Sequence, residues 1–279
     1  MQNILLINNK DFFDKYSIIT LNTKVEYWEV PKKTSILFIG NHHAGKDHIK
    51  SDLEYSLKNI SLQTAYKYVI IIGKTDDLID SNTKIPSNVV GIYANNINYD
   101  HNKIHFLPMG RDFRSISMFH LSNIENKTRN ILCYCNFSVN THPCRSIIYN
   151  NIKEKRYIDF EHMGNFLDYS ISRDIFFSKL SQSKFVICPR GNACDTFRFY
   201  DALYSGAIPI VVKMNFHNNF EDLPILFLDH EEDYKKLSED FLNNKYDELS
   251  KKIKPYYKEL DFNYWLHNIC TSLYEIMYF

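Results

Sequence analysis

The chain has 279 residues, of which 44% are hydrophobic and 24% charged, with 33 Lys and Arg residues against 33 Asp and Glu residues. This length allows one or two domains with a sizeable core, and the composition is that of a soluble globular protein, not a disordered one. A net charge of zero argues against binding of nucleic acid or of an anionic membrane surface through a basic face.

The sequence contains no apolar run close to the roughly 20 residues that a membrane-spanning helix needs. The apolar stretch Ile4–Ile7 is too short for a secretory signal and lacks a basic start. The six cysteines show neither CxxC nor zinc-finger spacing and are too sparse for a disulfide scaffold. We therefore expect buried, reduced thiols in a cytoplasmic protein.

In the first half of the chain, short apolar runs alternate with polar loops. The runs predict strands at Ser35–Gly40, Tyr68–Gly73, Asn88–Tyr93 and Lys103–Leu107. A helix over Asp47–Leu62 is expected after the first strand. Continuous apolar strands that alternate with helices are typical of parallel sheets covered on both faces. The polar, aperiodic segment Ser122–Asn130 predicts a linker.

The same pattern restarts after the linker. It predicts strands at Asn130–Tyr134, Lys184–Cys188 and Ala207–Val212, and helices at Thr141–Lys153, Arg173–Ser183, Asp195–Ser205 and Tyr256–Phe279. We expect an α/β protein of two Rossmann-like domains that face a cleft. Residues 1–124 would form the N-terminal domain and residues 125–255 the C-terminal domain, with helix 256–279 packing back on the first. Ligands of such sheets bind at the carboxyl ends of the strands.

The segment from Phe185 to Val212 indicates an anion site. Pro189 ends a strand, Gly191 permits a tight turn, and Asp195 or Thr196 is placed to cap the helix that follows. A helix N-terminus attracts anions, and Arg190 and Arg198 add fixed cations whose planar guanidinium groups suit phosphate.

Along this helix, Phe199, Ala202 and Leu203 share a core face, and Gly206 ends it as a left-handed cap. Arg198, Asp201 and Ser205 share the opposite face and are expected to point toward the cleft. There the Asp201 carboxylate could accept hydrogen bonds from ribose hydroxyls. The alternative is that Arg190 and Asp201 only form surface ion pairs.

This stretch resembles the exostosin-like glycosyltransferases of family 47. The matching segments are Pro189–Gly191, Asp195–Arg198, Asp201–Leu203, Gly206–Ile210, Asp222–Ile225 and, upstream, Asn136–Arg145. The resemblance covers about Arg129–Asp229 and is closest to compact members without a membrane anchor. It implies a GT-B fold, an inverting mechanism and a nucleotide-sugar donor held by the C-terminal domain. In the family the acidic residue on the helix is usually Glu, whereas Asp201 is one methylene shorter.

The upstream segment follows the first strand of the second half. Asn136, Ser138, Asn140 and Thr141 lie where a diphosphate would bind, and Arg145 comes about one turn into the next helix. The alternative is a loop of helix caps. Arg190, Arg198, Arg145 and the helix N-terminus can neutralise the departing diphosphate, and no DxD pair stands at a strand end here. We therefore expect no obligatory metal. The resemblance implies transfer of a sugar, with xylose a candidate, from a UDP-sugar to a glycan hydroxyl, with no cofactor.

The general base is expected in the N-terminal half. Asp76 and Asp77 follow one strand and are the first choice, although either could instead cap a helix. Further candidates after the preceding strand are His42, His43 and Asp47, where the histidines could equally be exposed loop residues. We expect His101 and Arg111 to contact the acceptor or the phosphates.

Two other functions compete with this one. The first is a P-loop-like NTPase or kinase, because the segment Gly40–Lys46 fits the pattern GxxxxGK. However, Asp47 stands where Ser or Thr should hold magnesium, and a carboxylate there would repel phosphates. A non-catalytic carbohydrate-binding protein on the same fold is also compatible with the 20 Tyr and 20 Phe residues. Formation of a transfer product separates it from an enzyme.

Overall fold

The structure is a computed structural model that describes residues 20–21, 36–42, 52–62, 67–76, 78–111, 128–161 and 171–278. The chain divides into two units. The first comprises Met1–Gly110, Ala193–Asp195 and Asp261–Phe279, and the second comprises Arg111–Asn192 and Thr196–Leu260. The N-terminal segment of the first unit thus ends at Gly110, whereas the predicted boundary near residue 124 lies outside the described residues.

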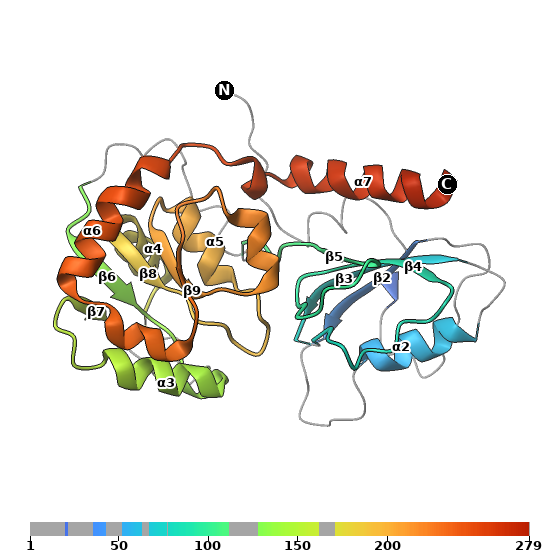
Figure 1. Ribbon diagram of the computed structural model, residues 1–279, viewed down its shortest axis with the longest axis horizontal. Coiled ribbons are helices and arrows are strands. Elements are labelled where there is room, and N and C mark those ends of the chain that lie inside the picture. The colour runs from blue at the N-terminus through green and yellow to red at the C-terminus, as the bar shows by residue number, and fades with distance from the viewer. Residues whose placement is uncertain are drawn as a thin grey trace. The chain divides into compact units, whose positions relative to one another are not determined.

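The first unit contains a five-stranded parallel sheet whose strands lie in chain order (Figure 1). Its elements are β1 (Thr20–Leu21), β2 (Ile36–His42), α2 (Asp52–Ser61), β3 (Tyr68–Thr75), β4 (Val89–Ala94) and β5 (Ile104–Phe106). Residues Tyr68–Ile72 of β3 are all buried, because neighbours and covering layers enclose a central parallel strand on both faces. This explains the unbroken apolar run that predicted the strand.

The C-terminal helix α7 (Phe262–Tyr278) belongs to the first unit, not to the sheet that precedes it in the chain. The Trp265 ring meets Phe106 of β5 edge to face, with 5.8 Å between the ring centroids. Figure 1 shows α7 in red beside the sheet of this unit. The chain therefore returns to its first unit at its C-terminal end.

The second unit is built on a second parallel sheet, in the order β10-β9-β8-β6-β7. Its strands are β6 (Ile131–Cys135), β7 (Ile158–Phe160), β8 (Ser183–Ile187), β9 (Ile208–Val212) and β10 (Leu226–Leu228). Its helices are α3 (Pro143–Ile152), α4 (Arg173–Gln182), α5 (Phe197–Tyr204) and α6 (Glu239–Leu249), and its short 3-10 turns are η3 (Val139–Thr141), η4 (Asn215–Phe220), η5 (Glu231–Lys236), η6 (Ser250–Lys252) and η7 (Lys258–Leu260). After β6 the chain forms β7 on one side of that strand, and it then returns to form β8 on the other side of β6. This reversal creates a topological switch point between β6 and β8, where open α/β sheets bind ligands.

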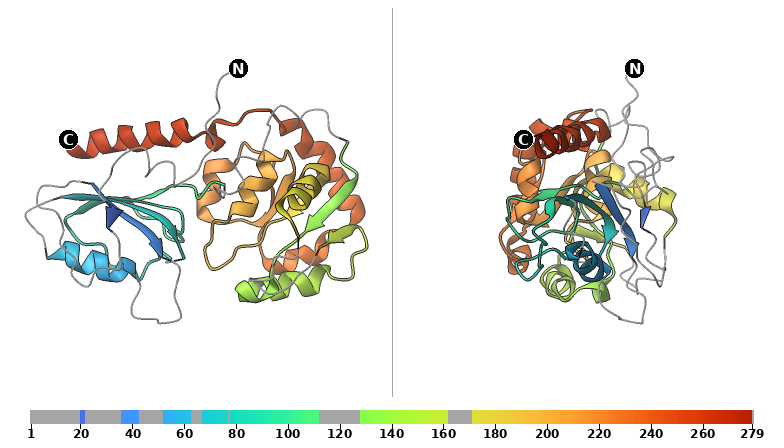
Figure 2. Two further views of the ribbon diagram at one scale, coloured as in Figure 1. Left: turned by 180° about the vertical axis from the view of Figure 1, so that it is seen from behind. Right: turned by 90° about the vertical axis from the view of Figure 1, so that its right-hand side faces the viewer.

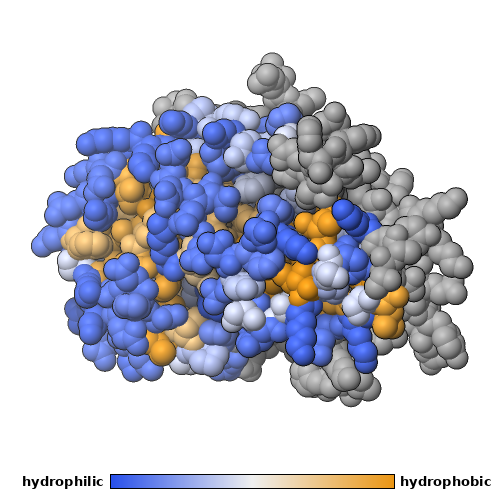
Figure 3. Space-filling model, turned by 45° about the vertical axis from the view of Figure 1, so that its right-hand side comes forward, coloured by the Kyte–Doolittle hydropathy of each residue, from blue (hydrophilic) through white to orange (hydrophobic). Residues whose placement is uncertain are grey.

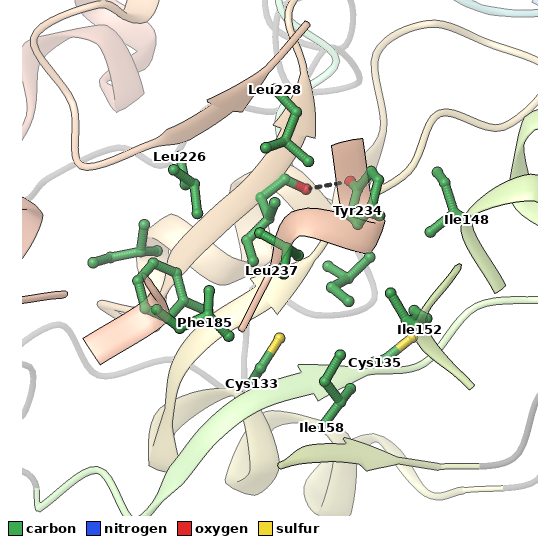
Figure 4. Packing of buried hydrophobic residues seen from close by; sticks show 14 of the residues in the cluster. Cys133, Cys135, Ile148, Ile152, Ile158, Phe185, Leu226, Leu228, Tyr234 and Leu237 are labelled. Atoms are coloured by element: carbon green, nitrogen blue, oxygen red, sulfur yellow. Dashed lines mark hydrogen bonds between the residues drawn. The ribbon is translucent and has the colours of Figure 1, made fainter. Parts of the chain in front are cut away.

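The core of the second unit lies between this sheet and the layer of α3, η5 and α6. Alternate strand residues such as Cys133, Cys135 and Phe185 face this layer and are fully buried (Figure 4). The buried Tyr234 hydroxyl donates a hydrogen bond to the Ile210 carbonyl at 3.0 Å, so the polar group of this large aromatic residue is satisfied. The other face of the sheet is covered by α4 and α5 (Figure 2).

The predicted α/β fold with parallel sheets is confirmed, and most of the expected strands and helices lie within a few residues of the observed ones. The C-terminal helix begins at Phe262 and not at Tyr256 as predicted. The sequence analysis missed β1, β7, β10 and α6. The six cysteines are free thiols, and all except Cys270 are buried. Among the described helices, none combines the length and apolar character that crossing a membrane requires. Hydrophilic side chains cover most of the described surface on the face in Figure 3.

Candidate functional site

The loops at the carboxyl ends of β6 and β8 are tied together by Arg145 of α3. Its guanidinium donates hydrogen bonds to the carbonyls of Arg190 (2.7 Å), Ser138 (3.0 Å) and Pro189 (3.4 Å). Arg145 is only 7% exposed. Its burial, together with the nearby Arg198, lowers the pKa of its guanidinium to about 10. Arg145 therefore shapes the site through backbone carbonyls, while its predicted phosphate contact stays a prediction.

Gly191 lies where a larger side chain would be crowded. A Cβ atom at this position would lie 3.2 Å from Arg145 Nη2 and 3.6 Å from Thr141 Cγ2. The left-handed glycines of the described chain are Gly110 and Gly206, with φ of 68° and 70°. Gly206 thus ends α5 as predicted, but the reason expected for Gly191 is wrong. Its role is to let the β8 loop approach α3 closely.

Arg190 and Arg198 are half-buried cations that form no ion pair with any described carboxylate. Arg190 donates to the carbonyls of Gly191 (3.3 Å) and Asn192 (3.0 Å). The Arg198 Nε atom is buried and has no hydrogen-bond partner among the described residues. A buried donor without a partner is costly, and a bound anion would satisfy it. The alternative of a surface ion pair therefore does not describe Arg190.

Two hydroxyl groups of the loop after β6, which Arg145 ties to the loop that carries Arg190, also lack partners. Ser138 Oγ and Thr141 Oγ1 are buried and make no hydrogen bond to described residues. Neither acts as the cap of α3, because that role belongs to His142, whose Nδ1 accepts the Cys144 N–H at 3.3 Å. Hydroxyl donors and guanidinium groups together suit phosphate oxygens. These four residues, Ser138, Thr141, Arg190 and Arg198, form what we call the anion cradle.

The sequence analysis did not single out His142, which caps α3 in the loop that carries Ser138 and Thr141. Burial lowers the pKa of its imidazole, and the nearby Arg190 and Arg145 lower it further. Its ring therefore favours the neutral form, as expected where positive charge is already concentrated. The signal in the sequence was the position of His142 directly before Pro143, since proline is favoured in the first turn of a helix and the preceding residue is its cap.

Asp201 and Arg111, both predicted to contact ligands, form a buried ion pair. Arg111 Nε lies 3.2 Å from Asp201 Oδ1, and the two side chains are 0% and 6% exposed. Ser205 is buried as well, and its hydroxyl donates to the Asp201 carbonyl at 2.7 Å. The prediction that Asp201 and Ser205 line an open face of α5 is therefore wrong. A ligand role for Asp201 or Arg111 stays a prediction.

Of the two residues predicted to cap α5, the structure has Thr196 in the N-cap position. Its side chain makes no cap hydrogen bond. Asp195 and its neighbours belong to the first unit, where its Oδ2 accepts the Met109 N–H at 2.7 Å. In the same unit, the Cys194 N–H donates to Asn96 Oδ1 at 2.8 Å. The Asp195 carboxylate thus binds the chain after β5 and does not cap α5.

Among the base candidates, Asp76 is exposed and directly follows β3 in the first unit. Asn96 Nδ2 donates to its carbonyl at 2.9 Å and so fixes the backbone there. Asn95 and Asn96 are fully buried after β4. They were missed, although their place directly after an apolar run was a usable signal. His42 ends β2, but its side chain lies outside the described part, as do Asp77, His43 and Asp47.

His101 does not lie with Asp76. It precedes β5, and its Nδ1 accepts the Lys103 N–H at 3.1 Å. Because the sheet is parallel, the residue before β5 lies at the amino edge, opposite the edge that Asp76 occupies. The contact of His101 with the acceptor or the phosphates stays a prediction.

The P-loop alternative conflicts with the course of β2. This strand continues through His42, and Gly40 pairs with Gly73 of β3. A P-loop leaves its strand at the first glycine and wraps around phosphates, whereas here the first three residues of the GxxxxGK segment are still in the sheet. In the described part of the chain, no three His, Cys, Asp or Glu side chains are grouped so as to hold a metal ion.

Two parallel α/β units, with an anion cradle at the switch point of the second, define a protein of the nucleotide-binding α/β class. Comparison with known proteins is more specific. The Exostosin GT47 domain model matches residues 80–238, more than half of the chain, and the chain belongs to this glycosyltransferase family. The resemblance found over Arg129–Asp229 is thereby confirmed.

Two solved structures show a distant likeness. One is a crystal structure of an α1,3-fucosyltransferase, 14% identical over 86% of this chain and 78% of that chain, with a TM-score of 0.48. The other is an α1,3-fucosyltransferase with GDP-fucose, 14% identical over 89% of this chain and 94% of that chain, with a TM-score of 0.45. No curated protein matches the sequence.

Proposed function

We propose that the protein transfers a sugar from a UDP-sugar to a hydroxyl group of a glycan, with inversion at the anomeric carbon and without an obligatory metal. Xylose is our candidate for the sugar. The observation that carries the proposal is the anion cradle, where Arg190 and Arg198 have no described carboxylate partner and two buried hydroxyls are unbonded. A nucleoside diphosphate supplies the negative oxygens that such a site lacks.

The cradle would act on the leaving group. When the bond between the anomeric carbon and the diphosphate oxygen breaks, its electron pair moves onto that oxygen. Arg190 and Arg198 then face a charge that is larger in the transition state than in the bound substrate. Stabilisation of this developing charge lowers the barrier to transfer.

The acceptor hydroxyl must lose a proton as its oxygen attacks the anomeric carbon. Asp76 or Asp77 would take up this proton, and His42 is the remaining candidate. A carboxylate is a weak base, so it receives the proton while the new C–O bond forms and the hydroxyl becomes acidic. Asp76 is exposed and directly follows β3, at the carboxyl edge of the sheet where ligands of such folds bind.

Titration of UDP into cradle variants tests the donor site. We expect Arg198→Ala and Arg190→Ala to weaken UDP binding by about tenfold or more, because each loses charge-assisted hydrogen bonds worth about 1.5–3 kcal/mol. Arg156→Ala is the matched control, since this exposed arginine precedes β7 at the amino edge of the same sheet. Unchanged UDP affinity in folded Arg190 and Arg198 variants would remove the cradle from the donor site.

The base is tested by sugar-transfer assays of Asp76→Asn and Asp77→Asn. We expect one variant to lose about 10²–10⁴-fold in turnover while it binds UDP as tightly as the parent protein, because general base catalysis contributes that much. If both variants remain active, the base lies elsewhere. If the parent protein binds UDP and a glycan but forms no product, it is a binding protein and not an enzyme.

A further inference from the structure

We propose that Glu161 binds the ribose hydroxyls of the donor nucleotide, the role that the family resemblance gives to Asp201. The inference rests on the proposed function, because it names a residue that recognises the same nucleotide. It concerns only the second unit, in which β6, α3 and β7 form one βαβ unit.

The position of Glu161 in this βαβ unit is the first argument. In dinucleotide-binding βαβ units, phosphates lie at a glycine-rich turn after the first strand, and an acidic residue about 20 residues further on binds the ribose hydroxyls. The turn after β6 has no glycine, so the likeness is one of position in the βαβ unit. Here the anion cradle includes Ser138 after β6, and Glu161 directly follows β7. The Glu161 N–H donates to the Cys135 carbonyl at 3.1 Å, which fixes this residue beside the end of β6.

The contacts of the Glu161 side chain are the second argument. The Tyr134 hydroxyl donates to Glu161 Oε2 at 2.7 Å, and Asn136 in turn hydrogen-bonds to Tyr134. Burial and the carboxylate both raise the pKa of the Tyr134 hydroxyl, so it remains a donor. Glu161 Oε1 makes no hydrogen bond to any described side chain, and the residue is half-buried. One oxygen is thus held in place and the other is available to accept from a hydroxyl.

Asp201 is less suited to this role in the structure. Its Oδ1 is engaged by Arg111 at 3.2 Å, and the residue is 5% exposed. A ribose that bound Asp201 would have to weaken a buried ion pair, which is costly because it leaves charge without compensation. Glu161 can accept a hydroxyl while its bond from Tyr134 remains intact.

The test compares UDP with 2′-deoxy-UDP by titration calorimetry. The parent protein should bind UDP about tenfold more tightly, because the deoxy analogue leaves a carboxylate oxygen unpaired. In Glu161→Ala and Glu161→Gln, UDP binding should weaken and this preference should fall to within about twofold. Tyr134→Phe, which affects a positioning residue, should reduce the preference only in part. Asp201→Asn should lower thermal stability and leave the preference unchanged.

Three results would overturn the inference. They are equal affinity of the parent protein for the two nucleotides, an unchanged preference in folded Glu161 variants, and loss of the preference in Asp201→Asn. The first needs no variant, so a folding defect cannot hide it. If the parent protein binds neither nucleotide, the proposed function itself fails, and the inference fails with it. Tight binding of both nucleotides without preference contradicts only the inference.

Discussion

Arg145 and Arg198 lie close together in the second unit but differ in how many of their donors form hydrogen bonds. Arg145 gives its donors to three backbone carbonyls, whereas the buried Nε of Arg198 has no partner among the described residues. In the sequence, each of these arginines lies near the start of a predicted helix, and both were predicted to contact phosphate. Which one is already satisfied depends on where two loops meet, and a local pattern does not contain that information.

The buried His217 makes stability depend on pH. Burial and, to a smaller extent, the nearby Lys213 together lower the pKa of its imidazole to about 3. The folded state therefore binds this proton less readily than the unfolded state, whose histidine pKa is about 6.5. The contribution is fully present above pH 6.5 and is lost as pH falls toward 3.

We expect the free energy of unfolding to fall by about 1–2 kcal/mol between pH 7.5 and pH 5 because of this residue. Urea unfolding at the two pH values measures it. The variant His217→Phe should be less stable at pH 7.5, because His217 Nδ1 accepts the Met214 N–H at 3.0 Å. It should nevertheless lose less stability than the parent protein on acidification. An equal loss in both proteins would show that other groups cause the dependence.

At the scale of elements, Arg129 secures the ends of two helices. It donates to the carbonyls of Ser181 (3.1 Å) and Ser183 (2.9 Å) at the end of α4, and of Ser205 (2.9 Å) at the end of α5. Helices leave their last carbonyls without intrahelical partners, and cations are favourable there. This one side chain before β6 therefore satisfies carbonyls of both helices that cover one face of the sheet.

Replacing Arg129 tests this role. Arg129→Ala should destabilise the protein by about 2–4 kcal/mol, because up to three charge-assisted hydrogen bonds are lost. Arg129→Lys should lose less, since it keeps the charge but has no planar group to reach both helix ends. Thermal unfolding measures the difference. A lysine variant as unstable as the alanine variant would mean that geometry alone, and not charge, matters at this position.

The elements that could be predicted from the sequence are those with a continuous buried apolar run, such as Tyr68–Ile72 of β3. Two strands with three residues each, Ile158–Phe160 and Leu226–Leu228, were too short to show a pattern. The end of β2 was placed too early, at Gly40, because its last residues are polar. Backbone pairing with β3 continues to His42 regardless of side-chain polarity.

At the scale of the whole molecule, two parallel sheets and the packing of the last helix on the first domain were predicted from the sequence. The side-chain contacts of that helix were not. Helix α7 has a Trp265 ring against Phe106, far apart in sequence. The pair Arg111 and Asp201, 90 residues apart, could not be inferred at all. Such long-range pairs depend on the assembled fold. For this reason the sequence indicated which arginines lie near the candidate site, but not which groups they bind.

The central claim is a metal-independent UDP-sugar site in the second unit. Calorimetric titration with UDP, GDP and ATP, each with magnesium and with a chelator, tests it most directly. We expect UDP to bind most tightly and to keep its affinity in the chelator, because Arg190 and Arg198 supply the positive charge for the diphosphate. A preference for ATP that requires magnesium, or UDP binding that the chelator abolishes, would contradict the account.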